Sequence, residues 1–400
     1  MSSPITGWQR SDGRKGIRNI VLVAYLVECA HHVCTQIARG YPDQDVQVIG
    51  FSGCFPSRYG QEMMEALCTH PNVGAVQLVS LGCENFRKTE LLRAVEASGR
   101  PVQLTTIQDV GGTRSAIDEG RAWVDARRAE LQCQPRVQIR HSDLVIGTIC
   151  GGSDATSGMT GNPAAGRAFD KLVAAGGTCI FEETGELIGC EHVMAARAAT
   201  PALKQELIRT VEKAAAYYAA MGYGSFSQGN ATGGLSTIEE KSLGAYAKSG
   251  DSQISGILRP AQRAATGGLY LLDVVPDGPP KFGFPNINDT AEIVELISCG
   301  VHAVIFVTGR GSVVGSAISP VLKVCANPDT YARMAEDMDV DAGRILTGEA
   351  TLDEVGEEIF GKVTALARGA TTASEDLGHT EFVLTYKSQT RPEPGCHSAA

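Results

Sequence analysis

The fold class is decided by the stretch Asp143-Leu-Val-Ile-Gly-Thr-Ile149, an apolar run that leads directly into a glycine-rich segment over residues 151–161. A helical pattern follows over residues 163–175. A short apolar run with turn residues at its end is typical of a buried strand in a parallel sheet. The three parts together predict one unit of strand, turn and helix.

The same alternation extends along the chain in both directions. Before this unit, apolar runs at 19–24, 46–50 and 76–80 alternate with helical patterns at 32–40, 58–69 and 88–98. After it, predicted strands at 178–181, 268–273 and 303–308 alternate with predicted helices at 195–218, near 236 and at 289–299. This order predicts βαβ units and therefore a mainly parallel sheet.

A chain of 400 residues is too long for one ordinary core. The predicted fold class is therefore α/β, with parallel-sheet βαβ domains, two or three of them packed together. We expect an N-terminal βαβ domain over 1–140 and a larger α/β catalytic domain over 141–390, with a division near residue 250 as an option. A polar tail over 391–400 is expected to be disordered.

Composition narrows the class of function. The net charge of −10 and the pI near 5.4 argue against binding to nucleic acid or to an anionic membrane surface. The N-terminus is polar, and the chain has no run of the ~18 apolar residues that spanning a bilayer requires. We therefore expect a cytoplasmic protein, in which the twelve cysteines are core residues, nucleophiles or metal ligands rather than disulfides.

Three cysteines share one context, because Cys54, Cys83 and Cys150 each follow an apolar run and stand beside glycine. Parallel sheets gather such strand ends at one edge. Three thiolates there could hold a 4Fe-4S cluster with one open iron, or a mononuclear Fe2+ ion. The alternative, that each is a small buried residue, stays open. The cysteines expected in the core are Cys29, Cys34, Cys68, Cys179, Cys299 and Cys325.

Polar segments near the predicted strands supply candidate substrate ligands. Arg14, Arg18 and Asn19 precede the first strand, where guanidinium groups could bind a substrate carboxylate, although a solvated basic loop is the alternative. Ser153 and Asp154 lie in the strand-to-helix turn, where they could bind an anion or a polyol, or simply cap the helix.

Candidate acid–base groups follow a later strand. The segment Glu182-Glu-Thr-Gly-Glu186 and the pair Glu191-His192 could form a hard-metal site, an acid–base pair or a solvated acidic helix start. If the cysteines hold no metal, Glu183, Glu186 and His192 are the next candidates. A glycine loop over 229–234 runs into a capped helix with Lys241 one turn in. No Walker A or complete dinucleotide motif is present, so the sequence does not support ATP or NAD binding.

Several segments resemble, in order from about residue 7 to about residue 383, the altronate/galactarate dehydratase family. They are Asp12-Gly-Arg-Lys-Gly-Ile-Arg-Asn19, Leu81-Gly-Cys-Glu84, Cys150-Gly-Gly-Ser-Asp154, Glu191-His192, Gly233-Gly-Leu-Ser-Thr-Ile-Glu-Glu-Lys-Ser-Leu-Gly-Ala245 and Thr308-Gly-Arg-Gly-Ser312. The resemblance implies iron-dependent dehydration of a sugar acid (a hexonate, pentonate or aldarate) to a 2-keto-3-deoxy acid. It also implies a small β-rich domain, which we expect here as a separate small subunit.

The sequence therefore predicts a hydro-lyase that works by metal-assisted β-elimination. The family also includes the large subunit of a sulfolactate sulfo-lyase, so release of sulfite is one alternative, and a non-catalytic sugar-acid-binding protein is another. We expect a homo-oligomer with no nucleic-acid or membrane partner. The predicted site residues are Glu84, His192 and Lys241 for acid–base work, Arg14, Arg18, Asn19, Ser153, Asp154, Arg310 and Ser312 for substrate, and Cys54, Cys83 and Cys150 for metal.

Overall fold

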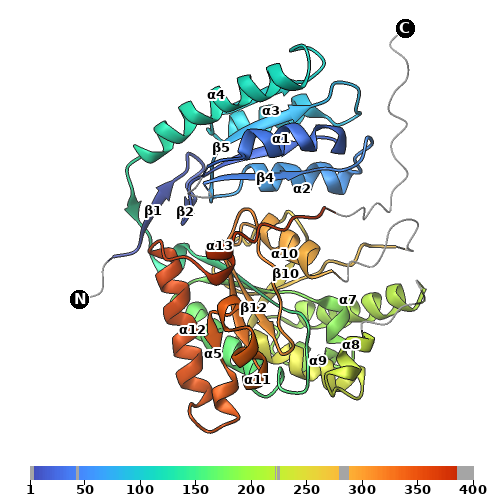
Figure 1. Ribbon diagram of the computed structural model, residues 1–400. Helices are drawn as coiled ribbons and strands as arrows, with labels where there is room; N and C mark the ends of the chain where they lie inside the picture. Colours follow the sequence, from blue (N-terminus) through green and yellow to red (C-terminus); the bar gives the residue numbers. More distant parts are fainter. Residues whose placement is uncertain (1–3, 42–44, 221, 223–225, 279–287, 385–400) are drawn as a thin grey trace.

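Two parallel sheets, one above the other in Figure 1, organise the chain. The computed structural model describes residues 4–41, 45–220, 222, 226–278 and 288–384, and the predicted tail over 391–400 lies outside these ranges. The predicted α/β class with parallel βαβ units is confirmed. No helix in the described ranges combines the length and apolar character that a membrane span requires.

The smaller sheet has the strand order β4-β3-β5-β6, and every neighbouring pair is parallel. Its strands are β3 (Ile20–Tyr25), β4 (Val46–Gly50), β5 (Val73–Ser80) and β6 (Val102–Thr106). All eight residues of β5 are buried, which is the pattern of a strand covered on both faces.

The helices of this domain pack in pairs. Helix α1 (His31–Ala38) contacts α4 (Thr113–Gln132), and α2 (Arg58–Cys68) contacts α3 (Lys88–Ala97). Three short strands form a separate antiparallel ribbon beside the sheet: β1 (Thr6–Gln9), β2 (Lys15–Gly16) and β7 (Val137–Gln138).

The larger sheet has the order β10-β11-β9-β8-β12-β13-β14 and is parallel throughout. Its strands are β8 (Val145–Cys150), β9 (Thr178–Phe181), β10 (Ile254–Leu258), β11 (Gly268–Leu272), β12 (Ala303–Thr308), β13 (Val321–Cys325) and β14 (Val340–Asp341). Strands from both sides of residue 250 belong to this one sheet.

Helices cover the larger sheet on both faces. Helix α5 (Gly161–Ala174) packs with α12 (Leu352–Ala367), while α10 (Asp289–Ser298) contacts β8, β12 and also α2 of the smaller domain. The remaining helices are α6 (Glu191–Ala195), α7 (Pro201–Ala220), α8 (Gln228–Thr232), α9 (Ile238–Tyr246), α11 (Pro328–Arg333) and α13 (Ala373–Leu377).

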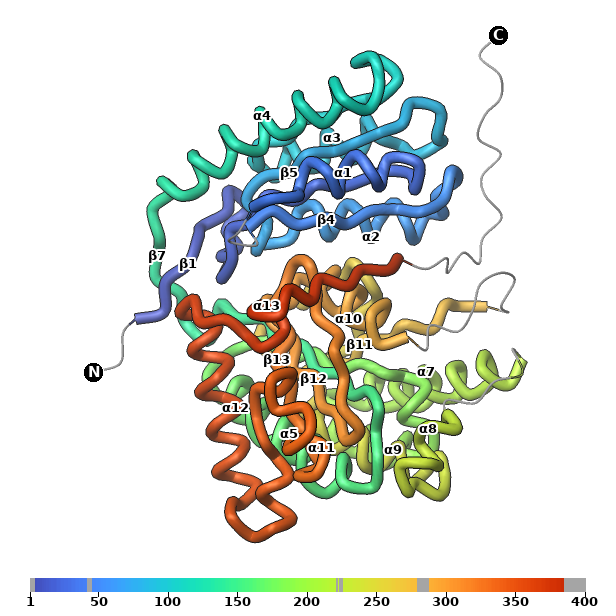
Figure 2. Tube along the Cα trace, in the orientation of Figure 1, coloured from blue at the N-terminus to red at the C-terminus, as the bar shows by residue number. Residues whose placement is uncertain are grey.

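The two domains share a hydrophobic core. One cluster of buried side chains includes Leu22 of the smaller sheet together with Ile149 and Leu296 of the larger domain. The segment after α13 returns between the domains (Figure 2), where the Gly315 amide donates to Glu381 at 2.8 Å. The domains are therefore joined by packing as well as by the chain.

Candidate functional site

The larger sheet changes its winding direction next to β8. From β8 the chain moves to β9 on one side, and from β12 it moves to β13 on the other, so the two crossovers leave in opposite directions. In open α/β sheets, ligands bind beyond the carboxyl ends of strands at such a point. The loops are tightly joined: the Arg310 amide donates to Gly152 O at 3.0 Å, and a Cβ at Gly309 would collide with the Asp154 carboxylate.

A thiol and two carboxylates meet at the ends of β8 and β9. The Cys150 thiol donates to Glu183 Oε2 at 3.1 Å and lies 3.7 Å from Glu186 Oε2, while the Cys150 amide donates to Glu183 Oε1 at 3.2 Å. The ligand atoms of Cys150, Glu183 and Glu186 lie within 4.8 Å of one another. Glu183 adopts φ +91°, a left-handed conformation that is strained for a residue with a Cβ and is often found at functional sites.

Two buried lysines neutralise these carboxylates. Lys248, which is completely buried, pairs with Glu183 and lies 3.4 Å from the Cys150 sulfur. Lys241, at the start of α9, pairs with Glu186. A buried charge without a partner is strongly unfavourable, so each lysine stabilises the carboxylate that it contacts.

Acidic groups nevertheless outnumber the lysines here. Burial, together with the negative charge of Glu186, raises the pKa of Asp289 to about 6. Burial and the neighbouring carboxylates, Glu182 first among them, raise the pKa of Glu292 well above its usual value. Burial also raises the pKa of the Cys150 thiol, although Lys248 opposes that shift. Burial and negative neighbours therefore favour the protonated forms of these groups, and shifts of this kind are common at functional sites.

The donor set fits a divalent transition metal. A soft thiolate combined with two carboxylate oxygens suits iron or zinc better than magnesium or calcium, which prefer oxygen alone. Cys150, Glu183 and Glu186 are the residues that would hold such an ion.

The structure brings several predicted substrate residues to this edge. The Asp154 carboxylate accepts from Thr156, Ser157 and Asn327, so it fixes the turn rather than facing a ligand. Ser153 is buried next to it and lies within hydrogen-bonding reach of Cys150. Arg310 is exposed at the rim and donates to Gly229 O at 2.9 Å, and Ser312 accepts from the Val314 amide.

Other predicted residues lie elsewhere. Cys54, Cys83 and Glu84 follow β4 and β5 of the smaller sheet, outside the group formed with Cys150. Burial opposes ionisation of Glu84, but hydrogen bonds from Ser80 and Gly82 outweigh it and lower the pKa of that carboxyl. His192 is exposed on the short helix α6. One core prediction is wrong: Cys29 is exposed, because it lies in the 3-10 helix Glu28–Ala30 before α1, of which only Ala30 is buried.

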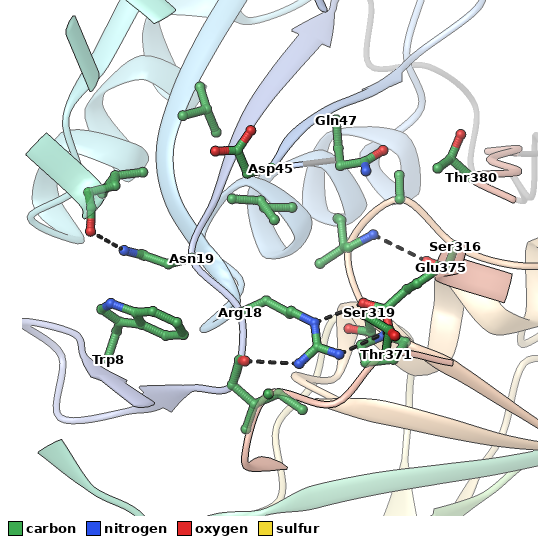
Figure 3. Close-up of a pocket in the computed structure, with 18 of the residues that line it drawn as sticks. Trp8, Arg18, Asn19, Asp45, Gln47, Ser316, Ser319, Thr371, Glu375 and Thr380 are labelled. Carbon is green, nitrogen blue, oxygen red and sulfur yellow. Dashed lines mark hydrogen bonds and ion pairs between the residues drawn. The ribbon is translucent and has the colours of Figure 1, made fainter. Parts of the chain in front are cut away.

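Arg18 lies at the amino ends of the strands and joins the two domains (Figure 3). Its five N–H groups donate to both oxygens of Glu375 and to the carbonyls of Ile17, Leu366 and Ala370. All five donors are therefore used within the protein, which leaves none for a substrate carboxylate.

Arg14 and Asn19 are also held by the protein. Arg14 pairs with Asp12 and donates to Thr69 O, and the Asn19 amide joins Arg10 to Leu131. Arg18 and Asn19 do line a cavity of about 760 Å³ between the domains (Figure 3). The residues that line this cavity include segments that directly precede β3, β4 and β13. The cavity therefore lies at the amino ends of these strands, whereas Cys150 lies at a carboxyl end.

Sequence reasoning missed Lys248, Asp289 and Glu292. No local sequence motif marks Lys248, and its partner Glu183 lies 65 residues earlier in the sequence. The sequence predicts Asp289 only as the start of a helix. Its place in the first turn of a helix that follows a glycine- and proline-rich segment is the signal that could have found it.

The fold and this cluster define an α/β protein of the doubly wound type, with a thiol, buried carboxylates and two buried lysines at the switch point. Comparison with known proteins identifies the family. Residues 141–390 match the D-galactarate/altronate dehydratase C-terminal domain, and residues 7–132 match the second domain of D-galactarate dehydratase/altronate hydrolase. The chain belongs to the galactarate/altronate dehydratase family, which confirms the resemblance found in the sequence.

Its relatives are lyases. The chain is 34% identical to (2R)-sulfolactate sulfo-lyase subunit beta of Chromohalobacter salexigens, over 95% of this chain and 96% of that protein. It is 30% identical to altronate dehydratase of Escherichia coli, over 94% of this chain and 76% of the relative. The galactarate dehydratase (L-threo-forming) of Escherichia coli is 32% identical, over 75% of this chain and 57% of its own length.

Proposed function

We propose that this protein is a lyase that eliminates water from a hexonate, pentonate or aldarate and yields a 2-keto-3-deoxy acid. The observation that carries the proposal is the pair of buried lysine–carboxylate contacts beside Cys150, at the carboxyl edge of the sheet. Elimination next to a carboxylate requires a base for the α proton, cations for the enediolate and an acid for the leaving hydroxyl. This cluster contains a group for each role.

Lys241 and Lys248 supply the fixed positive charge. Both ammonium groups are shielded from water, where they stabilise a developing enediolate more strongly than they would in bulk solvent. Asp289, with its pKa raised to about 6, lies against Gly151 and is suited to exchange a proton near neutral pH. Arg310, exposed at the rim, offers a planar guanidinium to a substrate carboxylate.

Iron is the metal we propose for Cys150, Glu183 and Glu186. When bound, the ion would supply Lewis-acid stabilisation of an oxyanion. Because burial keeps the Cys150 thiol protonated, that thiol must release its proton to become a ligand. The two lysines then keep the surrounding carboxylates neutralised.

The direct test supplies hexonates, pentonates and aldarates separately to anaerobically purified, iron-loaded protein and measures the 2-keto-3-deoxy product with a carbonyl reagent. Lys241→Met should lower kcat/KM by about 100-fold or more. The matched control is Lys171→Met. Lys171 is an exposed residue of α5 that pairs with Glu357 of α12 at 2.8 Å, so its replacement should leave activity unchanged. Lack of product from every acid, or full activity in Lys241→Met, would contradict the proposal.

Sulfite elimination is the second candidate. It is favoured by one observation: the relative matched over 96% of its length is named as a sulfolactate sulfo-lyase subunit. The chemistry is the same β-elimination with sulfite as the leaving group. Sulfite release from (2R)-sulfolactate, with no keto product from any sugar acid, would decide for this candidate.

The same relative's name supports a further part of the proposal, a separate small subunit for this protein. We also propose a cytoplasmic homo-oligomer. Activity that rises when a small β-rich partner protein is added, together with the mass measured by light scattering, would test both statements.

A further inference from the structure

The carboxyl edge of the smaller sheet carries three exposed cysteines on three neighbouring loops. Cys29 follows β3, Cys54 follows β4 and Cys83 follows β5, and these strands are adjacent in the order β4-β3-β5. In the part of the chain that the structure describes, Cys133 at the end of α4 is the other exposed cysteine. Free cysteines are usually buried, so three exposed ones at one edge require an explanation.

Hydrogen bonds hold the three loops together. The Glu28 amide donates to Ser52 O at 3.3 Å, which joins the loop of Cys29 to that of Cys54. The Asn85 amide donates to Cys54 O at 2.9 Å, which joins the loops of Cys54 and Cys83. The three cysteines are thus carried by one connected surface.

The side chain of Glu84 fixes the turn that carries Cys83. Its carboxylate accepts from the Ser80 hydroxyl and from the Gly82 amide, the latter at 2.9 Å. Gly82 has φ +128°, which a residue with a side chain would rarely adopt. The acidic residue predicted as an acid–base group therefore acts as a positioning residue for Cys83.

Each of these loops leads from a strand of the smaller sheet into a helix. Each cysteine precedes the N-terminus of a helix: Cys29 precedes α1, Cys54 precedes α2 and Cys83 precedes α3. The three cysteines therefore all stand on strand-to-helix loops, the place where parallel sheets carry their sites.

We propose that Cys29, Cys54 and Cys83 bind an iron–sulfur cluster. The described residues contain a single group with ligand atoms close enough for one ion, and it is the group of Cys150. The sulfurs of Cys29, Cys54 and Cys83 thus do not all lie within 4.8 Å of one another, and a cluster accepts a wider spacing because it distributes its thiolates over several irons. Each thiol loses its proton as it binds iron, and an iron of a four-iron cluster would remain without a cysteine.

This assignment replaces Cys150 with Cys29 in the predicted three-cysteine set. It does not rest on the proposed lyase activity, because a cluster at this edge can be measured without turnover.

The experiment is anaerobic purification, followed by reconstitution with ferric iron, sulfide and dithiothreitol, for the whole protein and for single cysteine variants. Iron, acid-labile sulfide, the visible charge-transfer absorbance and the EPR spectrum of the reduced protein are measured. Cys29→Ser, Cys54→Ser and Cys83→Ser should each lose sulfide and absorbance. Cys133→Ser, the matched exposed control, and Cys150→Ser should retain both.

Three results would overturn the assignment. Wild-type protein that binds no sulfide after reconstitution has no cluster site. Loss of sulfide in Cys150→Ser with retention in Cys29→Ser would restore Cys150 as the third ligand. Retention in all three edge variants would place the cluster elsewhere. Circular dichroism of each variant separates loss of the cluster from loss of the fold, and the lyase assay reports independently on the proposed function.

Discussion

Replacing Arg18 tests whether this residue binds the substrate or joins the two domains. Arg18→Ala removes two charge-assisted hydrogen bonds to Glu375, at 2.8 and 2.9 Å, and three bonds to backbone carbonyls. Its side chain is 16% exposed and that of Glu375 is 23% exposed, so solvent weakens the pair only in part. Hydrogen bonds to charged groups contribute about 1.5–3 kcal/mol each, and Glu375 keeps its bond from the Thr372 amide, so we expect a loss of about 2–4 kcal/mol.

For domains of this size, such a loss corresponds to a fall in Tm on the order of 5–10 °C. The assay is thermal unfolding followed by circular dichroism, paired with KM for the best substrate. Arg58→Ala is the control, because Arg58 forms an exposed pair with Glu62 that contributes about 0–1 kcal/mol. A large rise in KM for Arg18→Ala with an unchanged Tm would refute the structural role and return Arg18 to the substrate site.

Two further changes probe the buried cluster. Lys248→Met leaves Glu183 buried without its cation and should destabilise the protein by about 3–5 kcal/mol in urea unfolding, whereas adding Glu183→Gln should recover part of the loss. The pKa of Asp289 is raised from 3.8 to about 6 by burial, so the folded state binds this proton more tightly than the unfolded state. Its protonation therefore contributes stability below about pH 4 that is lost as pH rises through about 6. Asp289→Asn should flatten that part of a plot of Tm against pH and lower kcat/KM; an unchanged profile would remove Asp289 from both roles.

Most of the strands that the sequence predicts are rich in apolar residues and contain no charged side chain. Strands such as β5 and β12 are buried on both faces, so their whole sequence is apolar enough to detect. Strand β13 was missed because Lys323 interrupts its apolar run, and the structure nevertheless buries that lysine. Strand β6, at the edge of its sheet, is only half-buried and contains three polar residues.

The long helix α4 was missed for a related reason. Four of its twenty residues are buried, so its apolar stripe is too sparse to predict a helix by periodicity. Packing on α1 and on the sheet holds it in place instead.

The candidate site was predictable only where a local pattern carried it. Glycines beside Cys150 and the family motif around Lys241 pointed to both residues. Lys248 and Asp289 join them through contacts between distant segments, which no local pattern encodes. Cys29 is predicted to lie in the core, whereas the structure places it in a 3-10 helix, Glu28–Ala30, in which Ala30 is the buried residue.

One helix connects the two edges that carry the proposed sites. Asp289, in the first turn of α10, lies against Gly151, which follows Cys150. Glu295, six residues further along α10, accepts a hydrogen bond of 2.5 Å from the Tyr59 hydroxyl. Tyr59 belongs to the first turn of α2, which follows the loop of Cys54. Six helical residues span about 9 Å, so the acid–base cluster and the cysteine edge are joined through a short rigid element rather than through a flexible linker.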